Sequence, residues 1–165
     1  MSSVSKQHTV IDSPYGPLTL VADGDGVLCG LYMTDQRHRP PEETFGERDE
    51  HPFDEAKDQL AAYFAGRLRR FTLPLSLSGT PFQRRVWEQL RAIPYGETRS
   101  YGDLAHTLGT PGASRAVGLA NGKNPIGIIV PCHRVVGADG NLTGYGGGLP
   151  RKQRLLDFES GAALF

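Results

Sequence analysis

The chain has 165 residues, of which 38% are hydrophobic, 22% charged and 8% aromatic, so it has the length of one average domain or two small ones. The 21 glycines and 12 prolines predict many turns, but the composition differs from that of disordered or collagen-like chains. No apolar run approaches the roughly 20 residues that cross a bilayer, and residues 1–8 hold no hydrophobic signal segment. These features argue against secreted and membrane-spanning proteins, so we expect a cytoplasmic protein whose first residues are frayed.

The 18 basic and 18 acidic side chains cancel overall but are unevenly distributed. Residues 1–79 hold 8 Lys and Arg against 12 Asp and Glu, a net charge of −4, whereas residues 80–165 hold 10 against 6, a net charge of +4. We place a domain boundary between these halves. A basic C-terminal half suits a polyanionic partner, although charges can also partition in this way by chance.

The first half has the pattern of a small αβ domain with an antiparallel sheet. β-Like runs alternate with turn-forming Pro and Gly residues, and Asp-Gly-Asp-Gly at 23–26 predicts a hairpin turn. We expect three strands at 8–12, 18–23 and 27–33, followed by a charged surface loop at 34–51. An amphipathic helix is expected at 52–65, and a run that joins or flanks the sheet at 71–77. This half shows no cluster of residues suited to catalysis.

The second half is expected to be mostly helical, which makes the fold class α+β. Thr80, Pro81 and Gln83 form a capping-box signature at the start of one helix, and Ser100 can cap a second. The second and third helices, joined by a tight Gly-containing turn, have the helix-turn-helix pattern, although many helical hairpins never bind DNA. We predict three helices at 81–93, 100–108 and 113–121, a buried strand at 126–130 and a last helix at 150–159.

Cys132 is the leading candidate for a nucleophile. It follows a buried apolar run and Pro131, and it precedes His133 and Arg134. A thiolate is the reactive form of cysteine, and a nearby imidazole or cation lowers the cost of forming it. The alternative is a buried structural cysteine beside a surface His and Arg. Cys29 has only apolar neighbours in the sequence, which indicates a core thiol.

A metal site has no local signature in this chain. The two cysteines cannot form a disulfide framework, and the sequence contains neither a CxxC nor a His-x3-His spacing. The five histidines are scattered, so only a site assembled in three dimensions stays open. We expect no zinc and no cofactor.

A Gly-rich loop and a helix of small residues are further candidates for ligand contact. The loop at 143–148 lacks the register of a phosphate-binding loop, but its glycines could let the backbone approach a flat ligand beside Tyr145. An ordinary flexible loop is the alternative. Arg115 stands among small residues at 113–120, which allows close approach either to another part of the protein or to a nucleic-acid groove.

These motifs together resemble those of the O6-alkylguanine-DNA alkyltransferases. Pro131-Cys-His-Arg-Val135, preceded by Asn124-Pro125, resembles the active-site signature of that family. Further matching segments occur in the family's order: 93–98, 100–102, 113–118, 144–148 and Glu159. The similarity extends from about Thr9 to Glu159 and is strongest from Thr80 onward. It implies the same layout, an N-terminal αβ domain followed by a helical domain that carries the helix-turn-helix and the active site.

The resemblance implies direct repair of O6-methylguanine in double-stranded DNA. Cys132 would take the alkyl group, His133 would act through a bound water as the base for the thiol, and Glu159 would orient the imidazole. Asn124 would brace the segment between the recognition helix and the active site. Because a thioether is not hydrolysed by water, each molecule would act once.

The resemblance also implies how the damaged base is bound. Tyr101 and Tyr145 would donate hydrogen bonds to the guanine, and the backbone carbonyls of Cys132 and Val135 would accept from its exocyclic amine. Gly146, in the Gly-rich loop, stands where some relatives carry a polar residue, so the tolerance of bulky alkyl groups is left open. Activity on O4-methylthymine is left open as well.

Contacts to DNA are implied for the helix-turn-helix. Arg115 would fill the gap in the duplex after the nucleotide is flipped, and Tyr101 would crowd the adjacent phosphate. Ser100, Ala116 and Gly118 would lie at the DNA surface, where small residues permit close approach to the minor groove.

Two other functions compete with alkyl transfer. A non-catalytic sensor of alkylated bases would keep the fold but lack the nucleophile, so Cys132 argues against it. A Cys-His-Glu hydrolase would need an oxyanion hole and would leave the tyrosine, arginine and helix-turn-helix motifs unexplained. We expect damaged double-stranded DNA as the partner, no membrane contact and a monomer in solution; assembly of several copies along DNA is left open.

Overall fold

The computed structural model describes residues 5–161 and divides into two compact units, residues 1–77 and 78–165. Each unit is described separately. The expectation for the first residues of the chain lies partly outside the described residues, because it includes residues 1–4.

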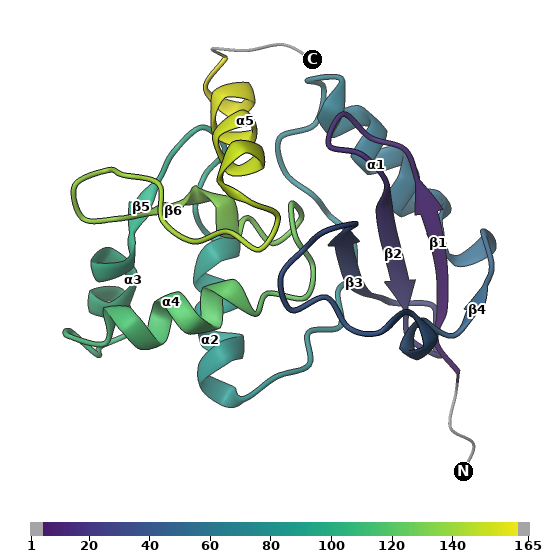
Figure 1. Ribbon diagram of the computed structural model, residues 1–165, viewed down its shortest axis with the longest axis horizontal. Helices are drawn as coiled ribbons and strands as arrows, with labels where there is room; N and C mark the ends of the chain where they lie inside the picture. The colour runs from purple at the N-terminus through teal and green to yellow at the C-terminus, as the bar shows by residue number, and fades with distance from the viewer. Residues whose placement is uncertain (1–4, 162–165) are drawn as a thin grey trace. The chain divides into compact units, whose positions relative to one another are not determined.

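The first unit is built on a four-stranded sheet with the strand order β3-β2-β1-β4 (Figure 1). The pairs β1/β2 and β2/β3 are antiparallel, as expected, and β4 adds to β1 in parallel. The turn between β2 and β3 is closed by Asp23, whose carboxylate accepts from the N–H groups of Asp25 and Val27. The strands are β1 (Gln7–Ile11), β2 (Leu18–Ala22), β3 (Leu28–Met33) and β4 (Glu47–Arg48).

The expectation of a plain surface loop over residues 34–51 is wrong. This segment holds the 3-10 turn η1 (Glu42–Phe45), strand β4 and the start of the 3-10 turn η2 (His51–Phe53). Phe45 is buried and stacks on Tyr32 with ring centroids 5.5 Å apart. A single aromatic side chain therefore anchors a segment whose charges otherwise predict exposure.

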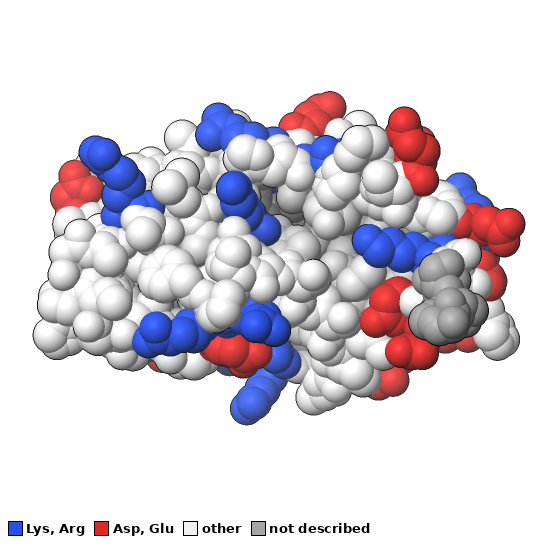
Figure 2. All heavy atoms as spheres, turned by 90° about the horizontal axis from the view of Figure 1, so that it is seen from below, with Lys and Arg blue, Asp and Glu red and all other residues white. Residues whose placement is uncertain are grey.

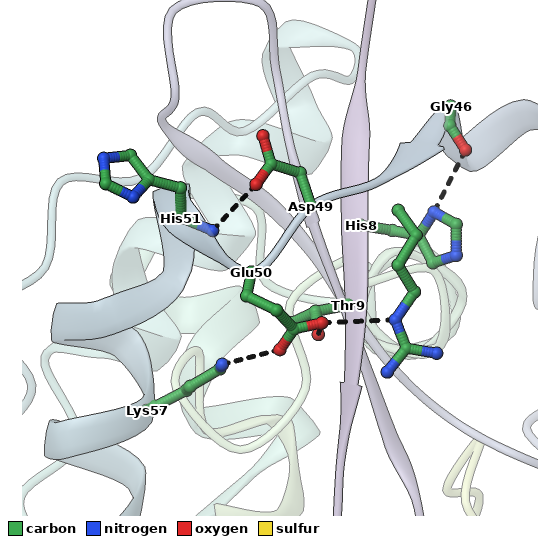
Figure 3. A network of polar contacts seen from close by, with 8 residues as sticks. His8, Thr9, Gly46, Asp49, Glu50, His51 and Lys57 are labelled. Atoms are coloured by element: carbon green, nitrogen blue, oxygen red, sulfur yellow. Dashed lines mark hydrogen bonds and ion pairs between the residues drawn. The ribbon is translucent and has the colours of Figure 1, made fainter.

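Glu50 joins this segment to β1 and to helix α1 (Asp54–Phe64) (Figure 3). Its carboxylate accepts from Lys57 Nζ at 2.7 Å, from Thr9 Oγ1 at 2.6 Å and from Arg48 Nε at 3.2 Å. Hydrogen bonds from Lys57, Thr9 and Arg48 lower the pKa of Glu50 to about 2. The network ties the segment around the short strand β4 to β1 and α1.

Helix α1 presents a buried face to the first unit, as its periodicity predicts. Ala56, Leu60 and Tyr63 are buried on it, and Tyr63 packs against Phe71. The run at 71–77 reaches the sheet through one parallel bridge between Leu75 and Leu28.

The second unit begins with helix α2 (Pro81–Arg91), whose capping box is formed as predicted. The Thr80 hydroxyl accepts from the Gln83 N–H, and the Gln83 side chain accepts from the Thr80 N–H. Trp87 is buried beside the expected apolar face and donates from Nε1 to the carbonyl of Ala120 at 2.9 Å. This bond ties α2 to the helix that carries Arg115.

The remaining elements hold a helix-turn-helix and a two-stranded parallel pair (Figure 1). Ser100 and Asp103 form a second capping box at the start of α3. The elements are β5 (Arg99–Ser100), α3 (Tyr101–Thr107), α4 (Ser114–Gly122), η3 (Cys132–Arg134), β6 (Val135–Val136) and α5 (Leu149–Ser160).

The predicted strand at 126–130 is absent, and a buried turn takes its place. The N–H of Val130 donates to the carbonyl of Ile126, and the N–H of Ile129 donates to that of Gly127. Ile128 has a φ of 70°, a conformation that β-branched residues rarely adopt. An apolar run of five residues is consistent with a buried strand or with any other buried backbone, and here the chain closes its hydrogen bonds within the turn.

Candidate active site

Cys132 lies in a single 3-10 turn that follows the buried turn at 126–130. The Cys132 N–H donates to the carbonyl of Val130, and the Arg134 N–H donates to that of Pro131. Cys132 is 7% exposed and His133 is fully buried. The backbone is therefore bent at Cys132. The side chains of Cys132 and His133 need not point to opposite faces, as neighbouring side chains on an extended strand do.

His133, Arg134 and Glu159 form a closed ionic group. His133 Nε2 lies 2.9 Å from Glu159 Oε2. Arg134 donates to both oxygens of the same carboxylate, at 2.7 Å from Nε and 2.9 Å from a terminal nitrogen, and it also donates to the carbonyl of Ile93. All three side chains are buried. The Arg134 guanidinium thus pairs with the carboxylate of Glu159. The sequence pattern had suggested that this cation would stabilise the thiolate of Cys132.

The surroundings of His133 fix its charge and tautomer. Burial lowers the pKa of His133, although Glu159 opposes this, so the imidazole is neutral at pH 7. Burial alone would raise the pKa of Glu159, but His133 and Arg134 outweigh it and hold that pKa well below its usual range. An ionised Glu159 accepts the Nε2 hydrogen, which leaves the lone pair on Nδ1. Among the described residues, this buried Nδ1 has no hydrogen-bond partner.

The Cys132 thiol is poised between opposing influences. Burial raises its pKa, whereas the Asn124 side chain, the positive charge of Lys152 and a backbone N–H lower it. Asn124 also closes the preceding turn, because its Nδ2 donates to the Val130 carbonyl at 2.8 Å and its Oδ1 accepts from the Ile126 N–H at 3.0 Å. One amide therefore braces the turn and lies close to the sulfur.

Lys152 is a site residue that the sequence analysis missed. It lies fully buried on α5, and its Nζ donates to the carbonyls of Thr143 at 2.8 Å and Gly144 at 3.3 Å. A signal was present in the sequence, because Lys152 precedes Glu159 by seven residues and so shares its helix face.

The predicted base-binding residues lie around the same loop. The Tyr101 hydroxyl donates to the Thr143 carbonyl at 3.1 Å, so α3 holds the start of the Gly-rich loop. Tyr145 and Gly146 are half-buried within that loop, and Val135 is buried in β6 directly after η3. The structure brings Tyr101 to the loop of Tyr145 and joins the loop to α5 through Lys152.

The predicted DNA-contacting residues lie on α3 and α4. Arg115 and Ala116 are exposed on α4, and Gly118 is half-buried where an added Cβ would lie 3.8 Å from the Tyr101 ring. Ser100 is half-buried and uses its hydroxyl to cap α3. Leu119, which the sequence analysis did not single out, is 66% exposed one turn after Arg115.

The described part of the chain holds neither a metal-binding cluster nor a membrane-spanning helix. Residues 5–161 contain no group of three or more His, Cys, Asp or Glu side chains placed to hold a metal ion. No helix in that range is long and apolar enough to span a bilayer.

Comparison with known proteins identifies the family. Residues 81–161 match the DNA binding domain of 6-O-methylguanine DNA methyltransferase, and residues 7–77 match the ribonuclease-like domain of the same family. The methylated-DNA–protein-cysteine methyltransferase of Mycobacterium tuberculosis is 58% identical over 94% of this chain and 93% of its own length. That of Methanosarcina acetivorans is 49% identical over 92% of this chain and 97% of its own length.

The fold agrees with these matches. The crystal structure of Mycobacterium tuberculosis OGT in complex with DNA superposes with a TM-score of 0.89 at 57% identity, covering 96% of this chain and 95% of that one. O6-methylguanine-DNA methyltransferase from Pyrococcus kodakaraensis strain KOD1 gives a TM-score of 0.56 at 26% identity, covering 93% of this chain and 98% of that one. This chain belongs to the 6-O-methylguanine DNA methyltransferase family.

Proposed function

We propose that this protein repairs O6-alkylguanine in double-stranded DNA by moving the alkyl group to Cys132, and that each molecule acts once. Membership of the family supports DNA as the partner and alkyl transfer as the reaction. The observation that carries the proposal is the state of His133. His133 is the residue directly after Cys132. Its Nε2 is hydrogen-bonded to Glu159, while its buried Nδ1 has no hydrogen-bond partner in the described chain.

His133 is the base for the thiol. Its neutral imidazole takes the Cys132 proton on Nδ1, directly or through one water, and becomes an imidazolium. Glu159 stabilises that cation through Nε2, and Arg134 keeps the carboxylate ionised and in place. The arrangement follows the logic of nucleophile, base and orienting carboxylate.

The thiolate then displaces guanine from the alkyl carbon. For a methyl lesion, the new S–C bond forms as the C–O6 bond breaks, and the electron pair of that bond stays on the base. The displaced base takes up the proton that His133 removed from the thiol, so S-methylcysteine, neutral guanine and a neutral His133 are the products. Tyr145 donates a hydrogen bond to the leaving base, and Tyr101 does the same by exchanging the Thr143 carbonyl, its acceptor in the free protein, for the base. The carbonyls of Cys132 and Val135 accept from the amine of the base. Gly146 lets the loop backbone approach the ring.

The reaction needs no cofactor and ends after one turnover. All atoms and electrons are supplied by the thiol and the alkylated base. The product is a thioether, which water does not hydrolyse, so Cys132 is not regenerated. O4-methylthymine presents the same kind of alkyl carbon and is a second candidate substrate.

Helix α4 is the element that we assign to the DNA groove. A methyl group on O6 cannot be reached inside a stacked pair, so the nucleotide must be extruded. Arg115 fills the gap, and Ala116, Gly118 and Ser100 allow the helix-turn-helix to approach the minor groove closely. The second unit carries 10 Lys and Arg against 6 Asp and Glu. On the face in Figure 2, several basic side chains lie apart from one another among uncharged residues.

We further propose that the protein acts as a monomer in the cytoplasm. The proposed catalytic, base-binding and DNA-contacting residues lie between positions 100 and 159 of one chain, so a second subunit is not needed to complete the site. The reaction consumes a reduced thiol, which reducing compartments preserve.

The test is the intact mass of the protein after mixing with a duplex that contains one O6-methylguanine, followed by peptide mapping. We expect one added methyl group per molecule, on Cys132, with no further addition at excess duplex. Cys132→Ala should gain none, whereas Cys29→Ala, the matched control, should gain one. An unchanged mass with tight lesion binding would favour a sensor, and an unchanged mass without lesion binding would favour a Cys-His hydrolase or a structural cysteine; either result would overturn the proposal.

A further inference from the structure

Lys152 is buried in a way that lysines rarely are. Its side chain has no exposed surface, and among residues 5–161 no carboxylate pairs with it. Lysine is almost never fully buried unless its charge is compensated. Here two backbone carbonyls, those of Thr143 and Gly144, receive its ammonium hydrogens. A charge kept inside at this cost points to a task for it.

The carbonyl of Thr143 is a meeting point of three elements. It accepts from Lys152 Nζ on α5 and from the Tyr101 hydroxyl at the start of α3. The loop that follows, 144–148, contains four glycines and has little conformational preference of its own. The two donors therefore fix the point at which this flexible loop begins.

The same ammonium also acts electrostatically on the sulfur. Arg134 donates its hydrogen bonds to the carboxylate of Glu159 and to the carbonyl of Ile93. His133 is neutral because burial lowers its pKa. The positive charge of Lys152 lowers the pKa of the Cys132 thiol against the effect of burial. In the reverse direction, burial lowers the pKa of Lys152 to about 8, and Cys132 opposes that change.

We infer that Lys152 is a positioning residue with two linked tasks: it holds the start of the Gly-rich loop through the Thr143 and Gly144 carbonyls, and its charge stabilises the Cys132 thiolate. The inference rests on the proposed function for its place in alkyl transfer. Helix α5 then supplies two charges of the site from one face, Lys152 for the sulfur and Glu159 for the base, while η3 supplies Arg134. The titratable groups that act on Lys152 or respond to it are Cys132 and His133, with Tyr101 sharing its acceptor.

The two tasks can be separated by substitution. Lys152→Met keeps most of the side-chain volume but removes the charge and the donors. Lys152→Gln keeps a neutral donor, and Lys152→Arg keeps the charge on a planar group of different reach. Lys6→Met, at an exposed position in the first unit, is the control for losing a lysine.

Two rates should be measured on each variant. The first is alkylation of Cys132 by iodoacetamide as a function of pH, resolved from Cys29 by peptide mapping. The second is methyl transfer from the duplex. We expect Lys152→Met and Lys152→Gln to move the iodoacetamide midpoint to higher pH and to slow alkylation at neutral pH about tenfold, because burial then raises the pKa of the thiol without the opposing charge of Lys152. Lys152→Arg should keep that midpoint near the wild-type value but slow methyl transfer, because its fork cannot reproduce both loop contacts.

The outcomes separate this inference from the proposed function. Wild-type midpoints and wild-type methyl transfer in Lys152→Met and Lys152→Gln would overturn the role of Lys152. If Lys152→Met fails to fold, Lys152→Gln and Lys152→Arg carry the same comparison. If the wild-type protein takes no methyl group but the iodoacetamide midpoint still shifts, the proposed function fails while the action of Lys152 on the thiol stands.

Discussion

At the scale of single residues, the site depends on how Glu159 is satisfied. Its carboxylate receives three N–H groups, two from Arg134 and one from His133, at distances between 2.7 and 2.9 Å. Taking these charges out of water is costly, and the closed set of hydrogen bonds offsets that cost. The same contacts set the tautomer of His133, so stability and chemistry depend on one side chain.

We predict that Glu159→Gln destabilises the protein by about 3 kcal/mol, because Arg134 would be left buried without an anionic partner. Unfolding in urea, followed by the fluorescence of Trp87, would measure the change; Trp87 is the single tryptophan and is buried in the second unit. The matched control is Glu97→Gln, which breaks an exposed pair with Arg99 and should cost at most about 1 kcal/mol. Equal effects in the two variants would contradict the prediction.

Residue identity was predictable where a motif surrounds it. Cys132 and His133 are adjacent, and their chemistry can be seen in the sequence, whereas Asn124 and Glu159 follow from the family resemblance. Lys152 was not found, because lysines on amphipathic helices ordinarily extend their ammonium to solvent. Its burial depends on the carbonyls of a loop that approaches α5 only in the folded chain.

At the scale of elements, local chemistry decided which predictions succeeded. Helices α2 and α3 start at capping boxes, so their N-termini could be located to the residue. Strand β4 and the turn at 126–130 carry no such signal. β4 has two residues and is held by Glu50 contacts from distant positions, and the turn is closed by the Asn124 side chain. Side-chain hydrogen bonds fix both, long-range ones for β4 and local ones for the turn, and hydrophobic periodicity cannot report either kind.

Helix α4 supports a prediction about DNA. Arg115 and Leu119 are exposed one turn apart, and an apolar side chain 66% exposed on the helix that we assign to the DNA groove would pack against the minor groove in the proposed complex. We predict that Arg115→Ala and Leu119→Glu each slow methyl transfer from duplex DNA about tenfold or more, the first through lost support of the flipped state and the second through repulsion from phosphates.

The internal control for this pair is reaction with free O6-methylguanine base. That reaction needs neither flipping nor groove contact, so both variants should keep the wild-type rate. Equal losses on duplex and free base would place Arg115 and Leu119 in the folding of the site and remove them from DNA recognition.

At the scale of the whole molecule, neutrality conceals an electrostatic division. The total of 18 basic and 18 acidic side chains separates into −4 for residues 1–77 and +4 for residues 78–165, by 8 against 12 and 10 against 6. Long-range attraction to DNA is therefore modest for the molecule as a whole, and the second unit supplies it. The units also divide the chemistry, since every proposed site residue belongs to the second one.

The buried ionisable groups predict how the second unit responds to acid. The pKa of His133 is lowered by burial in the folded state, so below its ordinary value of 6.5 the unfolded chain binds a proton that the folded chain does not. The pKa of Glu159 is also lowered in the folded state, so its stabilising contribution is present above its ordinary value of 4.5 and is lost as the pH falls further. Both terms lower stability in acid, in two successive windows.

We predict that the free energy of unfolding, measured in urea by Trp87 fluorescence, falls from pH 7 to pH 5.5 through His133 and falls further toward pH 4 through Glu159. Glu159→Gln should be less stable at pH 7, should keep the first decrease and should lose part of the second, because an amide has no proton to bind in this range. A wild-type decrease below pH 5 in Glu159→Gln would show that other carboxylates carry the acid response, and a flat profile between pH 7 and 5.5 would show that His133 is not held neutral by the fold.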